Sequence, residues 1–191
     1  MKSFYLKSVA TFLGLLFLGS SICLSIHAQQ PAAPSLQEML NTEYKVSKTG
    51  SDANGFKIIE PGTVVVAKQA GIMATAPGSP HMIAFKLPKV CDNTFKNGSL
   101  SVSKACATTS VGSKFLTNGE QLYITKFEVN EKGNKISFNL VECDTCNGVQ
   151  KPSGMKVTVI FEFAPKFLDT AEPGQVTDVI DQVFMPLKPG R

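Results

Sequence analysis

Alternating apolar and polar residues mark the second half of the chain. From Met155 to Phe163, apolar side chains occupy every second position, and polar residues such as Lys156 and Thr158 stand between them. A period of two is typical of a β-strand with one buried face. The pattern predicts a strand whose apolar side chains belong to the core: Met155, Val157, Val159, Phe161 and Phe163.

More extended segments precede this strand. Gln121–Val129 and Lys135–Glu142 flank the turn-rich segment Asn130–Asn134, which predicts a β-hairpin. Shorter strands are expected over 44–46, 56–60, 63–67 and 72–76, and Gly71 is expected in the left-handed region of a hairpin that joins the last two. Residues 76–117 predict a long irregular excursion with some strand character over 82–87 and 100–103.

Helical periodicity appears at both ends of this β-rich region. Ser35 and Glu38 have the spacing of a capping box, and an apolar stripe follows them, so we expect a short helix there. Near the C-terminus, apolar residues at helical spacing predict an amphipathic helix over about 173–185, which Pro186 ends: Val176, Val179, Ile180, Val183 and Phe184.

Many strands and turns with a helix at each end indicate a mainly β fold. We expect a small antiparallel barrel or rolled sheet, because closure removes exposed edges and a helix can cover what stays open. One such domain is predicted over 35–187, after a linker over 29–34 and before a tail over 188–191. No strand–helix–strand alternation or glycine-rich phosphate loop suggests a nucleotide-binding fold.

The first 28 residues have the pattern of a secretory signal peptide. Lys2 and Lys7 precede an apolar stretch, and Ile26-His27-Ala28 resembles a cleavage site. We therefore expect an exported protein that is periplasmic, cell-surface or secreted. An uncleaved leader that anchors the protein in a membrane is the alternative. Cys23 lacks the neighbours of a lipidation site and is interpreted as an apolar residue of the leader.

Composition changes when this leader is set aside. The whole chain has 43% hydrophobic residues and a formal net charge of +4, and the loss of Lys2 and Lys7 lowers that charge to +2. So small a charge suggests no partner by itself. With no basic run and no set of exposed aromatic residues, nucleic-acid binding is not expected. The sequence indicates no cofactor and no oligomeric state.

Four cysteines remain after the leader: Cys91, Cys106, Cys143 and Cys146. In an exported protein they are candidates for disulfides, and spacing favours Cys91 with Cys106 and Cys143 with Cys146 among three possible connectivities. Cys143 and Cys146 also form a C-x-x-C motif, for which a redox pair or a zinc site are alternatives. The motif leads into a turn, and a redox pair usually begins a helix, so structural disulfides are favoured.

Other residues give little support to catalysis. His81 lies in the loop-rich excursion, and without a second histidine outside the leader or a Gly-x-Ser-x-Gly motif a hydrolytic triad is not expected. The carboxylates fall on strand and turn positions that are expected to be solvated: Glu120, Glu128, Glu131, Glu142 and Glu162.

Four segments together resemble a group of uncharacterised exported bacterial proteins: Pro61–Ile72, Gly119–Val129, Met155–Phe163 and Asp178–Phe184. The resemblance covers most of 61–184 and implies a signal peptide, a small β-rich domain and a C-terminal helix. It implies no activity and no site residues. We therefore expect an exported, non-catalytic module of unknown ligand that acts by binding or as a cell-envelope component. The alternative is an envelope thiol–disulfide protein that uses Cys143 and Cys146.

Overall fold

The structure is a computed structural model that describes residues 34–51, 56–76, 91–103, 112–150 and 153–187. All of them belong to one compact unit, 34–191. Its helices are α1 Leu36–Leu40, α4 Phe167–Thr170 and α5 Pro173–Ile180. Its strands are β1 Lys48–Gly50, β2 Lys57–Glu60, β3 Val64–Ala67, β4 Met73–Thr75, β5 Asp92–Lys96, β6 Ser99–Val102, β7 Ser113–Phe115, β8 Gln121–Asn130, β9 Lys135–Glu142, β10 Lys156–Glu162 and β11 Phe184–Pro186.

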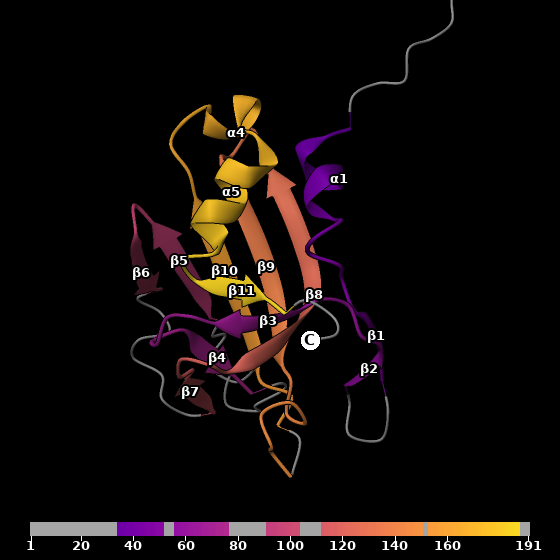
Figure 1. Ribbon diagram of the computed structural model, residues 1–191. Helices are drawn as coiled ribbons and strands as arrows, with labels where there is room; N and C mark the ends of the chain where they lie inside the picture. Colours follow the sequence, from indigo (N-terminus) through magenta and orange to yellow (C-terminus); the bar gives the residue numbers. More distant parts are fainter. Residues whose placement is uncertain (1–33, 52–55, 77–90, 104–111, 151–152, 188–191) are drawn as a thin grey trace, which may run out of the picture. The chain divides into compact units, whose positions relative to one another are not determined.

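The main sheet has the strand order β11–β3–β8–β9–β10–β4–β7, and it curls strongly into a half-barrel (Figure 1). β5 pairs with β10 and carries β6, while β1 and β2 form a separate two-stranded sheet. The predicted mainly β fold with a rolled sheet is confirmed. Its centre is the expected β8–β9 hairpin, followed by β10 in antiparallel pairing with β9.

The core lies on the inner face of the curled sheet. Alternate residues of β9 and β10 are buried, as the pattern predicts, although Phe163 is only half-buried against the core. Helices α1, α4 and α5 add apolar side chains to the same cluster: Leu36, Leu40, Leu168, Val176 and Ile180. Burial of each such side chain contributes about 1.5–3 kcal/mol, so the helices are held mainly by this packing.

Helix α1 has the capping box that the sequence predicts. The Glu38 backbone N–H donates to Ser35 Oγ at 3.2 Å, and the Ser35 backbone N–H donates to Glu38 Oε2 at 2.8 Å. Two backbone donors that a helix start leaves unpaired are thereby satisfied. Hydrogen bonding to Ser35 also holds the pKa of the Glu38 carboxyl below its usual value.

The C-terminal helix is shorter than predicted. It ends at Ile180 rather than near residue 185, and Phe184–Pro186 form a strand that pairs with β3. Val183 and Phe184 are fully buried, so the apolar pattern identified core residues but not their conformation. Backbone pairing with the edge of β3 replaces the last helical turn, and Pro186 is tolerated there because β11 is itself an edge strand.

The hairpin predicted between 63–67 and 72–76 is also wrong. Gly71 has the expected positive φ of 90°, but β3 pairs with β8 and β11, whereas β4 pairs with β7 and β10. The chain crosses from one end of the curled sheet to the other between these strands. Turn residues identify a reversal of the chain, and long-range pairing decides which strands become neighbours.

The excursion over 76–117 contains more strand than predicted. β5 and β6 form a hairpin in which Asn97 and Gly98 have positive φ, and β5 runs parallel to β10. Because a parallel pair needs a long connection, the local pattern does not reveal it. Among the strands that the structure describes, β5 and β10 form the one parallel pair of an otherwise antiparallel sheet. β5 extends the sheet beside β4, so that both strands meet the same edge of β10.

The predicted strand over 44–46 is an extended segment without a regular ladder. It exchanges hydrogen bonds with Thr63, and the Ser47 N–H donates to the Ile124 carbonyl at 2.7 Å. This contact lies beside the register shift in β8 between Ile124 and Lys126. The segment leads into β1, and it fixes the start of the β1–β2 hairpin against the main sheet.

We predict that Gly62→Ala lowers the free energy of unfolding by about 1–3 kcal/mol, because overpacking a tight contact forces the backbone to shift. A Cβ at this position would overlap the Lys45 carbonyl oxygen and lie 2.7 Å from the Ser47 nitrogen. Urea denaturation measures the change. Gly174→Ala is the control, because a Cβ there meets nothing within 4 Å. Equal stability of the two variants would contradict the prediction.

Several predictions lie outside the described residues: the leader over 1–28 with Cys23, the linker over 29–33, the strand character over 82–87, His81, Cys106 and the tail over 188–191. In the part of the chain that the structure describes, no helix has the length and apolar character needed to cross a membrane.

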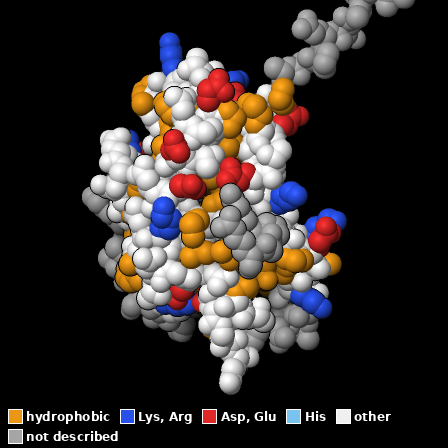
Figure 2. Space-filling model, in the orientation of Figure 1, with side chains coloured by type: hydrophobic (Ala, Val, Ile, Leu, Met, Phe, Trp, Pro, Cys, Tyr) orange, Lys and Arg blue, Asp and Glu red, His pale blue; other side chains and the backbone are white. Residues whose placement is uncertain are grey.

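Exposed apolar side chains occur on several elements of the described surface: Val46, Ile59, Phe115, Val149, Met185 and Leu187. In the view of Figure 2, hydrophobic side chains form a band across the face that carries β11, between acidic and basic residues. Exposed apolar residues are normal on soluble proteins, and this band by itself identifies no partner.

Candidate functional site

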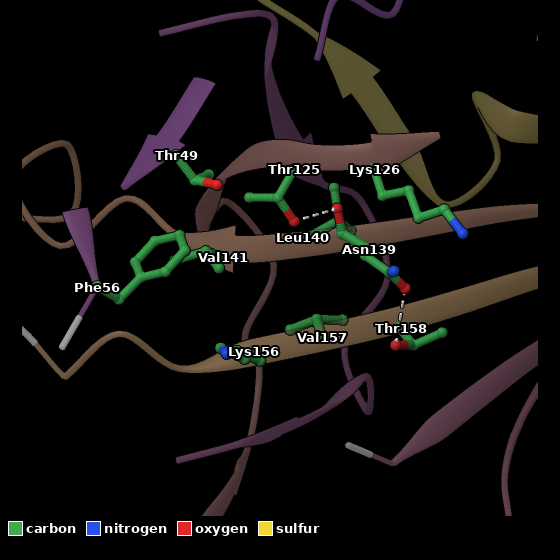
Figure 3. Close-up of a pocket in the computed structure, with 10 residues that line it drawn as sticks. All are labelled: Thr49, Phe56, Thr125, Lys126, Asn139, Leu140, Val141, Lys156, Val157 and Thr158. Carbon is green, nitrogen blue, oxygen red and sulfur yellow. Dashed lines mark hydrogen bonds between the residues drawn. The ribbon is translucent and has the colours of Figure 1, made fainter. Parts of the chain in front are cut away.

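A hollow of about 340 Å³ lies between the β1–β2 hairpin and the outer face of the main sheet (Figure 3). We call it the hairpin groove. It is lined by residues of β1, β8, β9 and β10 and by the residue that precedes β2: Thr49, Phe56, Thr125, Lys126, Asn139, Leu140, Val141, Lys156, Val157 and Thr158. Its size is at the lower end of the range for small-molecule pockets.

The floor of the hairpin groove follows from strand register. Val141 lies opposite Lys156, and Asn139 lies opposite Thr158, in the antiparallel β9–β10 pair. Directly opposed residues share a face, and their alternation with buried Leu140 and Val157 places them on the outer face. The register that builds the core therefore also brings an amide, a hydroxyl and an ammonium group together on the other side of the sheet.

Phe56 forms part of the opposite wall. The Lys156 ammonium lies 5.6 Å from the centroid of the Phe56 ring, a cation–π contact. Lys156 forms no ion pair with any residue that the structure describes. Lys126 differs, because its ammonium pairs with Glu128 Oε2 at 2.6 Å. Lys156 is thus the positive charge of the groove without a counter-ion among the described side chains.

Hydrogen bonds within the groove converge on Asn139. The Thr125 hydroxyl donates to its backbone carbonyl at 2.9 Å, and the Thr158 hydroxyl donates to its Oδ1 at 3.1 Å (Figure 3). Both bonds occupy acceptors, and the bond from Thr158 also orients the side-chain amide. Asn139 Nδ2 makes no hydrogen bond with the described residues, so it remains a donor for another molecule.

A second polar region surrounds the turn after β9, where Cys143 and Cys146 are joined by a disulfide with a Cα–Cα distance of 5.2 Å. Cys143 is buried and Cys146 is exposed. The Cys146 N–H donates to Cys143 Sγ at 3.2 Å. Asn147 fixes the turn to β8, because its side chain accepts from the Gln121 N–H and donates to the Gln121 carbonyl. The disulfide therefore closes a rigid turn at the end of the sheet.

Buried carboxylates lie beside this turn. Glu142, expected to be solvated, has a side chain only 2% exposed and pairs with the Lys114 ammonium at 2.8 Å. Glu120 lies 3.3 Å from the same ammonium. Burial lowers the pKa of Lys114, but hydrogen bonds and charge from Glu142 and Glu120 outweigh burial and raise it. Sequence periodicity missed this pair because β7, β8 and β9 meet only in the folded sheet.

Asp144 is held by backbone and side-chain donors. Its Oδ2 accepts from the Ser153 N–H at 3.1 Å and from the Gly154 N–H at 3.3 Å, and the Ser153 hydroxyl donates to Oδ1 at 3.1 Å. Asp144 thereby ties the disulfide turn to the segment that leads into β10.

The other predicted site residues are placed differently. Cys91 is buried at the start of β5 and is disulfide-bonded, while Cys106, its expected partner, lies outside the described residues, as does His81. The described residues contain no group of three or more His, Cys, Asp or Glu side chains suited to a metal ion.

Sequence reasoning missed the hairpin groove. Asn139, Lys156 and Thr158 fit the polar half of an alternating pattern, which is usually only a solvated face. The outer face of β9 and β10 carries β-branched and amide side chains, which is a weak local sign of a binding site. The wall that turns this face into a hollow comes from Thr49 and Phe56, about a hundred positions earlier in the chain.

Comparisons with known proteins give no further guide to this site. The chain matches no protein-family model, no curated protein and no solved structure. Inference about function therefore rests on the chemistry of the groove and of the disulfide turn.

Asp181 ends α5 in another polar cluster. Its Oδ1 and the Tyr44 hydroxyl are buried without hydrogen-bond partners. Burial raises the pKa of Asp181, the charge of Asp178 adds to this, and Lys68 opposes it. Burial also raises the pKa of Tyr44, with contributions from Glu43 and Asp181.

We predict that Asp181→Asn stabilises the protein at pH 7 by a few tenths of a kcal/mol. A raised pKa means that the folded state binds the proton more tightly, so stability falls as the pH rises through the folded pKa. The ionised carboxylate also faces the negative end of the α5 dipole. Melting temperatures from pH 3 to pH 7 measure the effect, which is expected to shrink in acid. Asp92→Asn, which changes an exposed aspartate of β5 whose charge does not contribute to the raised pKa of Asp181, is the control. A destabilised Asp181→Asn protein at pH 7 would contradict the prediction.

Proposed function

We propose that this protein is an exported, non-catalytic module of the cell envelope that binds a small ligand in the hairpin groove. The observation that carries the proposal is a hollow in which Lys156, Asn139 and Thr49 present polar groups that form no ion pair and donate no hydrogen bond to the described residues. Polar groups that face a hollow and are not used by the fold are available to a ligand.

The groove favours binding over group transfer. Its Thr125 and Thr158 hydroxyls donate to Asn139, whose backbone carbonyl and amide oxygen are too weakly basic to accept a proton in catalysis. A threonine nucleophile needs an adjacent base. The bond from Thr158 also orients the amide for recognition, which suits a site that holds a molecule unchanged.

Export is supported by the signal-peptide pattern of the first 28 residues and by the resemblance to exported bacterial proteins. Intact mass of the protein from its native host tests this part of the proposal. We expect a chain that begins at Gln29 and whose mass is unchanged by an alkylating agent unless its disulfides are first reduced, that is, a chain without free thiols. A chain that retains Met1 would instead favour an anchored module.

Binding is tested by titrating the ¹⁵N-labelled exported protein with a low-molecular-weight extract of the host envelope. We expect amide signals of groove residues such as Val141 and Lys156 to shift. Thr158→Tyr, which fills the groove, is expected to abolish the shifts. Thr94→Tyr is the matched control, because Thr94 is a half-buried threonine of β5 that does not line the groove. Shifts that persist in Thr158→Tyr, or no shifts in the parent protein, would overturn the proposal.

An envelope thiol–disulfide activity is the second candidate, favoured by one observation: Cys146 is exposed, with its sulfur 3.9 Å from the Tyr123 hydroxyl. Its reduction potential distinguishes the candidates. A structural disulfide is expected below about −300 mV, whereas an exchanging pair is expected near about −200 mV. The burial of Cys143 favours the first result, and rapid exchange with glutathione would favour the second.

A further inference from the structure

We propose that the ligand of the hairpin groove carries an anionic group, and that Lys156 and Asn139 recognise it together. This inference rests on the proposed function and deepens it by assigning the ligand a chemical class. The class is a small molecule rich in hydrogen-bond acceptors, with a carboxylate, phosphate or sulfate group.

The first argument is the imbalance between donors and acceptors. Asn139 Nδ2, the Thr49 hydroxyl and the Lys156 ammonium donate no hydrogen bond to the described residues, whereas Asn139 Oδ1 and its backbone carbonyl already accept hydrogen bonds. Anionic oxygens accept several hydrogen bonds at once, and bonds to a charged group are about twice as strong as neutral ones. A donor-rich hollow therefore favours an anion.

The second argument is charge. Among the residues that the structure describes, no Asp or Glu lines the hairpin groove, and the charge of Lys126 is compensated by Glu128. Lys156 alone brings a charge that the described residues leave unpaired. Lys156 is half-buried and its ammonium lies over the Phe56 ring, so an ion pair formed there is screened less than one at an open surface.

The third argument is the position of the two groups. Asn139 and Lys156 come from adjacent strands, where Val141 lies opposite Lys156 and Asn139 lies opposite Thr158. Asn139 is fixed by two hydrogen bonds, and Lys156 lies over Phe56. Groups held before the ligand arrives lose less conformational entropy on binding. Phe56 also offers a ring against which the apolar face of a sugar-like ligand can pack.

The test compares glucose with glucuronate, two ligands that share a ring and differ in one carboxylate. Binding to the exported protein is followed by amide shifts of groove residues and by calorimetry. We expect glucuronate to bind about tenfold more tightly than glucose, with an affinity that falls as salt is added. Inorganic phosphate and sulfate form separate arms. Tighter binding of either ion than of glucuronate identifies a phosphate or sulfate group instead of a carboxylate, within the same proposal.

Two variants test whether Lys156 supplies the charge that binds the anion. Lys156→Gln is expected to reduce glucuronate affinity about tenfold, to the level of glucose. Lys126→Gln is the matched control, because this lysine lines the same groove but is paired with Glu128, and less than a twofold change is expected. Melting temperatures of both variants show whether they are folded. Asn139→Ala tests the second donor, and we expect it to lose glucuronate affinity severalfold.

Three results would overturn the inference. One is equal affinity for glucose and glucuronate, and another is unchanged glucuronate binding by Lys156→Gln. The third is the absence of groove shifts with glucuronate, phosphate and sulfate at millimolar concentration. In each case, if a neutral component of the envelope extract shifts the amide signals of groove residues, the proposed binding function remains supported. No shifts with any component would overturn both.

Discussion

Asn93→Ala is expected to lower the free energy of unfolding by about 4 kcal/mol, because backbone groups of Met73, Cys91 and Thr158 would lose the hydrogen bonds of its amide. The Asn93 side chain is fully buried where β4 and β5 meet the same edge of β10. Its Oδ1 accepts from the Met73 N–H at 2.7 Å. Its Nδ2 donates to the Met73 carbonyl at 3.0 Å and to the Thr158 carbonyl at 2.9 Å. The amide therefore replaces backbone pairing where the sheet divides.

Urea denaturation measures this effect, and two further variants show its cause. Asn93→Asp keeps the volume but loses the donors and places a charge against carbonyl oxygens, so it is expected to be as destabilising as Asn93→Ala at neutral pH. Asn139→Ala removes a half-buried amide of the outer face and is expected to cost about 1 kcal/mol. If Asn93→Ala cost no more than Asn139→Ala, the bridging role of Asn93 would be wrong.

Phe138→Ala is expected to cost about 3–5 kcal/mol, as is typical when a buried phenylalanine is truncated and a cavity remains. Phe138 is fully buried at the centre of an aromatic cluster. Its ring centroid lies 4.8 Å from that of Phe127, 5.3 Å from that of Tyr44 and 5.7 Å from that of Phe161. Because these rings come from the sheet and from the segment after α1, one substitution loosens several elements.

Thermal and urea denaturation of Phe138→Ala are compared with two controls. Phe138→Leu retains most of the apolar volume and is expected to lose less stability than Phe138→Ala. Phe115→Ala removes a ring that is 57% exposed and is expected to change stability by about 0.5 kcal/mol or less. A Phe138→Ala protein as stable as Phe115→Ala would show that the aromatic cluster does not hold the sheet together.

Alternation along β9 and β10 predicted their strands and nearly all of their core residues, because one buried face leaves a strong period of two. The capping box of α1 could be predicted equally well, since its two residues lie three positions apart. Pairing between distant segments could not be predicted. Neither the β3–β8 pair nor the parallel β5–β10 pair leaves a local trace, so the hairpin predicted around Gly71 was wrong.

The candidate site was harder to predict than the fold. Cys143 and Cys146 were evident as a motif, and spacing alone suggested that they lie close together. Lys156 and Asn139 looked like ordinary polar residues of a strand, because their importance depends on Phe56 and Thr49 lying over them. The burial of Glu142 had the same origin, since its partner Lys114 belongs to another strand.

The parallel pairing of β5 with β10 has a consequence for the order in which the chain folds. Lys96 and Glu162, paired across these strands, are 66 residues apart in the sequence. Closing so long a loop costs more entropy than closing the short β8–β9 turn, and the cost is recovered only when the distant strands meet. β10 is first held in place by pairing with β9, and its other edge can then pair with β5. Folding is therefore expected to start in the β8–β10 meander, with β5 and β6 docking late.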